Sequence, residues 1–463
     1  MKEIWAAEAI VVVFLVLPLF RPFFKALRPL DGLEWLPLIA LCITAAIFPA
    51  YGFRPECLPM LFAALVVNVA RFIPRRDGSR HSRPPLLTAL WLVLVAAAAI
   101  PMFAFSPRAY AASEEPPPPR ALSIASAEGE YVLRVYGSVR PGSVSPIIFL
   151  VPPELGSASA DLVCRELREN GFTVVTYSRR DFDIPHIGEA GNRRTVSPFA
   201  LPGRWHIFRQ AADRYSANER GKALEAQRRS DIEYLLPRLH VMLGVTSHGD
   251  LPPLLLAGYG AGGSALAYLA GEPGFASRYG RVMGAAAIES RLWSAYQRKD
   301  PYVPDIPPST GMIRRQALLI GGRLRNMGPQ RVIRTGPLPG TGLPVMYLVS
   351  GRALDASRGQ KPYQAVYEAM RSGSGPAILA AIESAGPLDY QDYPYTHPLY
   401  SLLMPGLRSA KKSDNPVSDT AAVIGNFTVY LLERTRQAEI GSPSRRAIDG
   451  SLAVESKGLP GFP

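Results

Sequence analysis

Four long apolar runs, separated by charged or proline-rich breaks, fill the first part of the chain. They occupy residues 4–20, 35–51, 57–70 and 85–105. A helix needs about 20 mostly apolar residues to cross a hydrocarbon core of about 30 Å, and the third run is short for this. The first run carries Glu8 and the third carries Asn68. Buried helices of a soluble domain are the alternative, but four runs in series favour an all-α transmembrane segment of about four helices within residues 1–105.

The basic residues between these runs predict an orientation. The first connection contains Arg21, Lys25 and Arg28, and the third, "RFIPRRDGSRHSR", contains five arginines, whereas the second contains only Arg54. Because positively charged loops stay in the cytoplasm, we expect a multi-pass protein of the cell membrane with both termini outside. The large C-terminal part would then lie on the extracytoplasmic, periplasmic side. Loss of one span would reverse this orientation.

Two further segments have the composition of connections. Residues 106–129 contain "EEPPPP", which is typical of an extended spacer, so we expect a proline-rich linker there. The triplet Ala109-Tyr110-Ala111 in this segment also has the small-x-small pattern of a signal peptidase site, with a plain linker as the alternative. We expect residues 441–463 to form a flexible C-terminal tail.

Between these segments, residues 130–440 alternate strand-like and helix-like patterns. "EYVLRVYGSVRP" alternates as an early antiparallel strand would. Fully apolar short runs follow, each suited to a buried parallel strand: "SPIIFLVPP", "FTVVTYS", "LPPLLLAG", "RVMGAAAIES" and "LPVMYLVSG". Helical spacing appears between them, and the helix "KALEAQRRSDIEYLLPRLHVML" is expected to be interrupted near Pro237. Repeated β-then-α order predicts a mostly parallel sheet flanked by helices, with ligands bound beyond the carboxyl ends of its strands.

One of these strand-to-helix turns has an unusual sequence. In "LLLAGYGAGGSALAYLAG", Gly258, Gly260 and Gly262 are spaced as the glycines and the central residue of the G-x-S-x-G nucleophile elbow, with Tyr259 and Ala261 between them. The turn therefore resembles that of the α/β-hydrolase superfamily. Glycine-rich strand-to-helix turns also bind phosphates, so the turn alone is a weak signal.

The surrounding order strengthens the resemblance. "FLVPPELGSASADLVCRELRENGFTVVTYSRRDF" is similar to the stretch around the oxyanion strand in plasma-type platelet-activating-factor acetylhydrolases and dienelactone-hydrolase-like proteins. The resemblance implies an α/β-hydrolase domain. It also implies an oxyanion-like pocket in which the backbone N–H groups of Leu155 and Ala261 are donors and Tyr259 stands beside the pocket.

The same resemblance implies that the catalytic triad is degenerate. Gly260 occupies the position of the nucleophilic serine, and Pro387, in "AGPLDYQDYP", occupies that of the histidine. Only the acid position, Asp355 in "LPVMYLVSGRALDASR", keeps a suitable side chain. Loss of the nucleophile or base costs about 10⁴–10⁶ in rate in such enzymes. We therefore expect a catalytically inactive, esterase-like or lipase-like pseudoenzyme that binds a lipid-like ligand or a protein partner.

Two alternatives remain open. An active carboxylic-ester hydrolase or phospholipase would need a relocated nucleophile, and Ser264 and His397 are the less suitable substitutes: Ser264 lies one turn into the helix, and His397 precedes a proline. Alternatively, the membrane segment performs the function and the outer domain is a sensor.

The net charge and the spacing of cysteines and histidines indicate which partners and cofactors to expect. The chain carries 51 Lys and Arg against 38 Asp and Glu, a net charge of +13, with no basic tract interleaved with aromatic residues in the outer part. This favours a lipid membrane as partner over nucleic acid. Three cysteines and six histidines show no zinc-binding spacing, so we expect no metal and no cofactor.

Overall fold

The computed structural model describes most of the helices and strands of the chain and several single positions between them. The described residues are 2–20, 24, 27, 30–51, 55–72, 85–105, 119–126, 129–139, 145–153, 160–179, 183, 218–279, 281–290, 292, 294–299, 331–334, 336, 338–339, 342–351, 364–372, 375–383, 385, 390, 416–435, 445–446, 452–457, 459 and 462. The chain divides into two compact units: the described residues of the first lie within Met1–Ser113, and those of the second lie from Glu114 onward.

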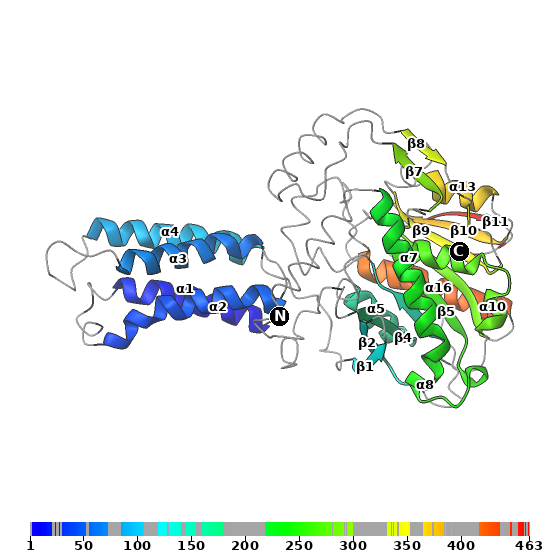
Figure 1. The fold of residues 1–463 in the computed structure, drawn as a ribbon, viewed down its shortest axis with the longest axis horizontal. Helices are drawn as coiled ribbons and strands as arrows, with labels where there is room; N and C mark the ends of the chain where they lie inside the picture. The colour runs from blue at the N-terminus through cyan, green and yellow to red at the C-terminus, as the bar shows by residue number, and fades with distance from the viewer. Residues whose placement is uncertain are drawn as a thin grey trace. The chain divides into compact units, whose positions relative to one another are not determined.

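The first unit consists of helices at the positions of the four apolar runs (Figure 1). They are α1 (Lys2–Val16), α2 (Leu36–Tyr51), α3 (Leu58–Phe72) and α4 (Pro85–Ala104), with short 3-10 helices η1 (Leu17–Phe20), η3 (Asp31–Trp35) and η4 (Pro55–Cys57). Helix α1 packs on α2 and α4, and α3 packs on the same two helices. Apolar side chains such as Val11, Ala40, Met60 and Val95 fill the space between them.

The predicted transmembrane spans are not found in this unit. No helix in the described part of the chain is both long enough and apolar enough to cross a membrane. Helices α1, α2 and α3 contain 15, 16 and 15 residues. At about 1.5 Å of rise per residue each is about 24 Å long or shorter, less than a hydrocarbon core of about 30 Å.

The second unit is built on one large sheet. Its strands are β1 (Arg120–Ser126), β2 (Gly129–Tyr136), β3 (Ile147–Val151), β4 (Thr173–Arg179), β5 (Leu254–Tyr259), β6 (Val282–Ile288), β9 (Val345–Ser350), β10 (Ala377–Ile382) and β11 (Leu452–Lys457). Their order among the described residues is β1-β2-β4-β3-β5-β6-β9-β10-β11. The pairs from β4 to β10 are parallel, whereas β1, β2 and β11 pair antiparallel at the two edges. A separate two-stranded antiparallel sheet consists of β7 (Tyr296–Lys299) and β8 (Arg331–Arg334). The mostly parallel sheet that the sequence predicts is confirmed.

Helices cover both faces of this sheet (Figure 1). One face carries α5 (Asp161–Glu169) and α16 (Pro416–Arg434), which contact each other. The other carries α7 (Asn218–Leu235) and α9 (Gly260–Ala270), which also contact each other. The remaining helices of this unit that the structure describes are η8 (Leu236–Arg238), α8 (Leu239–Leu243), η9 (His248–Asp250), α10 (Phe275–Arg278) and α13 (Gln364–Ser372). The predicted interruption near Pro237 is confirmed, because η8 separates α7 from α8.

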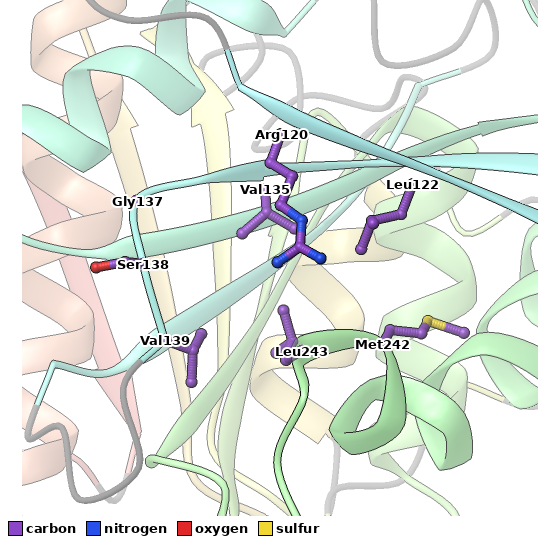
Figure 2. A pocket seen from close by; sticks show the side chains of 8 residues that line it. All are labelled: Arg120, Leu122, Val135, Gly137, Ser138, Val139, Met242 and Leu243. Carbon is purple, nitrogen blue, oxygen red and sulfur yellow. The ribbon is translucent and has the colours of Figure 1, made fainter.

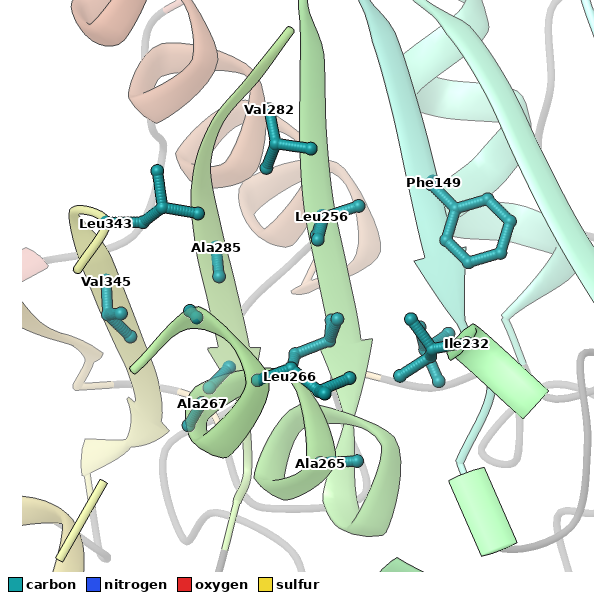
Figure 3. Close-up of a cluster of buried hydrophobic side chains, with 14 of the residues drawn as sticks. Phe149, Ile232, Leu256, Ala265, Leu266, Ala267, Val282, Ala285, Leu343 and Val345 are labelled. Atoms are coloured by element: carbon teal, nitrogen blue, oxygen red, sulfur yellow. The ribbon is translucent and has the colours of Figure 1, made fainter. Parts of the chain in front are cut away.

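The largest core lies between the sheet and the layer of α7 and α9. Figure 3 shows Phe149, Leu256, Ala285 and Val345 from four neighbouring strands, facing helix side chains that include Leu266 of α9. All five side chains are fully buried. At about 1.5–3 kcal/mol for each fully buried large apolar side chain, this layer holds α9 firmly at the carboxyl end of β5.

Two strands lie in segments where the sequence analysis expected none. β1 falls within residues 106–129, the expected linker, and β11 falls within residues 441–463, the expected flexible tail. Both are edge strands with polar or small residues, so their apolar signal is weak and pairing with a neighbouring strand decides their conformation. In β1 only Leu122, Ile124 and Ser126 turn partly inward.

Candidate functional site

The glycine-rich turn lies where the central strand β5 passes into α9. Tyr259 is still extended, with φ −101° and ψ 145°, and Gly260 has φ +52°. A positive φ strains any residue with a Cβ, by about 1–3 kcal/mol where the surroundings enforce it. Nucleophile elbows place their serine in such a strained strand-to-helix turn. Gly260 therefore occupies the elbow backbone conformation but supplies no side chain.

The flanking glycines allow the strand and helix to approach closely. A Cβ at Gly262 would lie 2.7 Å from the carbonyl oxygen of Pro152 and 2.7 Å from Cγ1 of Val151. A Cβ at Gly258 would lie 2.8 Å from the carbonyl carbon of Gly262. All three distances are well below van der Waals contact, so these two positions exclude larger residues. The end of β3, the end of β5 and the start of α9 thus form one tightly packed backbone unit.

Ser264 is engaged in holding this turn together. Its Oγ donates to the carbonyl oxygen of Gly260 at 3.1 Å and accepts from the backbone N–H of Leu292 at 3.0 Å. The side chain is fully buried. A hydroxyl that is buried and bonded to two backbone groups is poorly placed to attack a substrate.

Of the other predicted site residues, two lie in the described part of the structure and four do not. Tyr259 is fully buried at the end of β5, and Ala261 is buried in the first turn of α9, the position from which an oxyanion donor is expected. Leu155, Asp355, Pro387 and His397 lie outside the described residues. Their assigned roles stay predictions.

Sequence reasoning missed two strained residues beyond β6, the strand next to β5. Glu289 has φ +50° and Leu292 has φ +48°. A carboxylate oxygen of Glu289 accepts from the backbone N–H of Ser350, and the Glu289 N–H donates to the carbonyl of Leu348 at 2.8 Å. The carboxyl ends of β6 and β9 are thereby linked. A glutamate directly after the all-apolar run "VMGAAAI" was the available signal.

A buried ionic cluster fixes the neighbouring edge of the sheet. Arg228 of α7 is fully buried, and its Nη2 lies 2.6 Å from Oδ1 of Asp183 and donates to the carbonyl oxygen of Pro153 at 2.8 Å. Its Nη1 also lies 3.3 Å from Oδ2 of Asp231. Because Pro153 lies two residues beyond the end of β3, Arg228 fixes the backbone at the carboxyl end of this strand.

The second carboxylate of this cluster is equally well partnered. Asp231 accepts from the hydroxyls of Tyr131 at 3.0 Å and Tyr177 at 3.3 Å, and Nη1 of Arg179 lies 3.5 Å away. Two arginines thus balance two aspartates. Burial raises the pKa of Asp183, opposed by Arg228, and burial together with Asp231 raises the pKa of Tyr177 well above its usual value. The cluster joins β2, β3, β4 and α7, and its residues were not singled out from the sequence.

These groups have no metal-binding arrangement. Within the described ranges, no three His, Cys, Asp or Glu side chains lie close enough together to hold a metal ion. At the carboxyl ends of the parallel strands, near Gly260, the described groups are backbone N–H donors, the Glu289 carboxylate and the ionic cluster, in which two arginines neutralise two aspartates.

Comparison with protein families gives one match in the first unit. The family TP_0976_N, described as an N-terminal domain, matches residues 2–104. No curated protein matches the chain.

Solved structures similar to the chain include several hydrolases. A ferulic acid esterase from Streptomyces cinnamoneus is 13% identical over 70% of this chain and 92% of its own, with a TM-score of 0.40. A dienelactone hydrolase from Anabaena variabilis is 14% identical over 64% of this chain and 100% of its own, with a TM-score of 0.30. Esterase 2 from Thermogutta terrifontis is 14% identical over 69% of this chain and 97% of its own, with a TM-score of 0.33.

The fold of the second unit follows from its own architecture. Its parallel central strands carry helices on both faces, and the strained turn at Gly260 presents the start of α9 at the carboxyl edge of the sheet. The second unit has an α/β-hydrolase fold.

Proposed function

We propose that this protein is a membrane-attached, catalytically inactive α/β-hydrolase-fold protein that binds a lipid-like ligand or a protein partner at the carboxyl edge of its sheet. Gly260 carries this proposal: it holds the strained backbone conformation of a nucleophile elbow, with φ +52°, and has no side chain that could attack an ester. Binding at this edge agrees with the general behaviour of parallel sheets.

The surroundings of the elbow support a binding role. The loss of a nucleophile is not compensated by Ser264, whose hydroxyl is bonded to Gly260 and Leu292. Pro387, at the expected histidine position, has no base. A serine hydrolase needs both a hydroxyl and a base within hydrogen-bond reach. Among the described residues, the edge offers a rigid backbone surface suited to recognition.

Membrane attachment is proposed for the first unit because its outer surface is apolar. Most large apolar side chains that are exposed in the described residues belong to this unit, and they include Trp35 (63% exposed), Phe62 (62%), Leu90 (63%) and Ile100 (67%). Water-soluble helices normally place such side chains inward. An apolar surface of this kind fits contact with lipid, and the basic connections predict that the second unit lies on the extracytoplasmic side.

Two measurements on the full-length protein test this function. Purified protein is incubated with p-nitrophenyl butyrate and with a fluorophosphonate probe, beside an active serine esterase. We expect no turnover above buffer and no labelling. Turnover that the phosphonate abolishes would establish an active hydrolase with a relocated nucleophile, and loss of that turnover in Ser264→Ala would identify Ser264 as the nucleophile.

Attachment is tested separately by cell fractionation. We expect the full-length protein to remain in the membrane fraction after an alkaline carbonate wash. Its release into the supernatant would contradict the apolar attachment while leaving the conclusion about the elbow untouched. Protease added to intact spheroplasts would degrade the second unit if it lies outside the cytoplasm.

A further inference from the structure

A small hollow lies at one edge of the sheet, between the β1–β2 hairpin and α8. Its volume is about 160 Å³. Figure 2 shows its lining, which combines apolar side chains with polar groups: Leu122, Val135, Val139, Met242, Leu243, Gly137, Ser138 and Arg120. Cavities of about 150 Å³ with apolar walls hold ligands of benzene size. The hollow therefore has room for a short aliphatic chain.

This hollow is separate from the elbow. Val135 and Tyr136 pair with Val175 and Val174, near the beginning of β4, and α8 precedes β5. The hollow thus lies at the amino ends of the parallel strands, whereas Gly260 lies at their carboxyl ends. A ligand here would not depend on the function proposed for the elbow.

Arg120 supplies the polar recognition group. Its side chain is exposed, and Figure 2 shows it directed toward the hollow, with the guanidinium between Val135 and Leu122. The Arg120 side chain forms no hydrogen bond or ion pair within the described part of the chain. The planar guanidinium matches a carboxylate with two parallel N–H···O bonds. The Ser138 hydroxyl is the other side-chain hydrogen-bonding group of the lining.

We propose that the hollow binds a small aliphatic carboxylate. The carboxylate pairs with Arg120 at the mouth, and a chain of a few carbons lies against Leu122, Val135 and Met242. An inorganic phosphate fits less well, because it has no aliphatic chain to lie against Leu122, Val135 and Met242. A neutral alcohol of the same length lacks the partner for Arg120. Charge and apolar length together define the ligand class.

The experiment measures hexanoate binding to the full-length protein by ligand-observed NMR titration. We expect saturable binding of hexanoate and at least tenfold weaker binding of hexanol and of inorganic phosphate. Arg120→Gln weakens hexanoate binding at least tenfold, since Arg120 is exposed and its replacement leaves the fold intact. Arg281→Gln removes another exposed arginine outside the hollow and leaves hexanoate affinity within twofold.

A second variant tests the cavity rather than the charge. Leu122→Trp places a large ring in the hollow at an edge strand, where aromatic residues are well tolerated, and should abolish saturable binding while the circular dichroism spectrum is unchanged. Non-saturable hexanoate uptake that Arg120→Gln does not alter would mean adsorption to the apolar first unit. That outcome, equal binding of hexanol, or unchanged affinity in Leu122→Trp would overturn the proposal.

Discussion

The hydroxyl of Ser264 donates to the carbonyl oxygen of Gly260 at 3.1 Å, so the nearest serine of the helix binds the very residue that replaces the nucleophile. The same hydroxyl accepts from the N–H of Leu292, a residue with φ +48°. Ser264 thus couples the elbow to the strained segment after β6. Its role in the described structure is to position backbone.

Ser264→Ala should therefore affect stability. The variant leaves the buried N–H of Leu292 without its acceptor, which costs about 1–3 kcal/mol in free energy of unfolding. Urea unfolding of both proteins measures this loss. Ser277→Ala, which removes an exposed hydroxyl bonded to Gly274, is the matched control and should change stability by no more than about 0.5 kcal/mol. An unchanged midpoint for Ser264→Ala would refute the positioning role.

Gly260→Ala should destabilise the protein although it adds only one methyl group. The added Cβ occupies a φ of +52°, which costs about 1–3 kcal/mol where the turn cannot relax. Gly249→Ala is the control, because Gly249 is exposed and its added Cβ meets only the Ser247 Oγ at 3.6 Å. Equal unfolding free energies for the two variants would show that the elbow is not strained. Gly260→Ser should share this loss and gain no esterase activity, because Pro387 supplies no base.

Arg228→Met should be strongly destabilising. It leaves the buried carboxylate of Asp183 without its charge partner, and removal of one member of a buried pair costs about 3–5 kcal/mol. The neighbouring Arg229 is a matched control on the same helix: its side chain is 42% exposed and pairs with Glu272. Arg229→Met should cost no more than about 1 kcal/mol. The double variant Arg228→Met/Asp183→Leu should recover part of the loss, and an additive result would contradict the buried pairing.

Alkaline pH should destabilise the protein through buried tyrosines. Burial raises the pKa of Tyr347 and of Tyr177, whereas a tyrosine in the unfolded chain has a pKa of about 10. Above that pH the unfolded state loses protons that the folded state keeps, so stability is complete below about pH 10 and falls as pH rises. Each tyrosine contributes a slope of up to about 1.4 kcal/mol per pH unit. Urea unfolding between pH 9 and pH 11.5 measures the slope, and Tyr347→Phe should reduce it.

Tyr347→Phe should also affect stability differently from Tyr390→Phe at neutral pH. The Tyr347 hydroxyl is buried and has no hydrogen-bond partner in the described part of the chain, so its removal should leave stability unchanged or raise it. Tyr390→Phe is the comparison, because the Tyr390 hydroxyl donates to the carbonyl of Val349 at 2.7 Å. That variant should lose about 1 kcal/mol. A larger loss for Tyr347→Phe than for Tyr390→Phe would contradict the assignment.

The central strands were predictable because each is apolar on both faces. "IIFLV", "TVVTYSR", "LLLAGY" and "VMGAAAI" are short apolar runs that end at turn residues, and burial between two helical layers demands that composition. β10, "AILAAI", has the same character but was not singled out. The edge strands β1 and β11 could not be predicted from composition, since their conformation depends on pairing.

The elbow was also predictable, because its glycines are required locally by φ at Gly260 and by close approach at Gly262. The ionic cluster was not. Asp183, Arg228 and Asp231 look like ordinary surface residues in sequence, and only the packing of α7 across β3 and β4 brings them together. Charges that become buried through long-range contacts leave no periodic signal. The four apolar runs did predict four helices, but no helix in the described ranges is both long enough and apolar enough to cross a membrane.

Strand β11 has a consequence for synthesis of the protein. It covers the edge of β10, whose six residues are all buried. During translation, β10 leaves the ribosome about 70 residues before the strand that covers it, so its edge stays open for several seconds at about 5–20 residues per second. A ribosome-associated chaperone that shields extended apolar segments would act in this interval, and messages truncated before residue 452 would yield aggregation-prone chains.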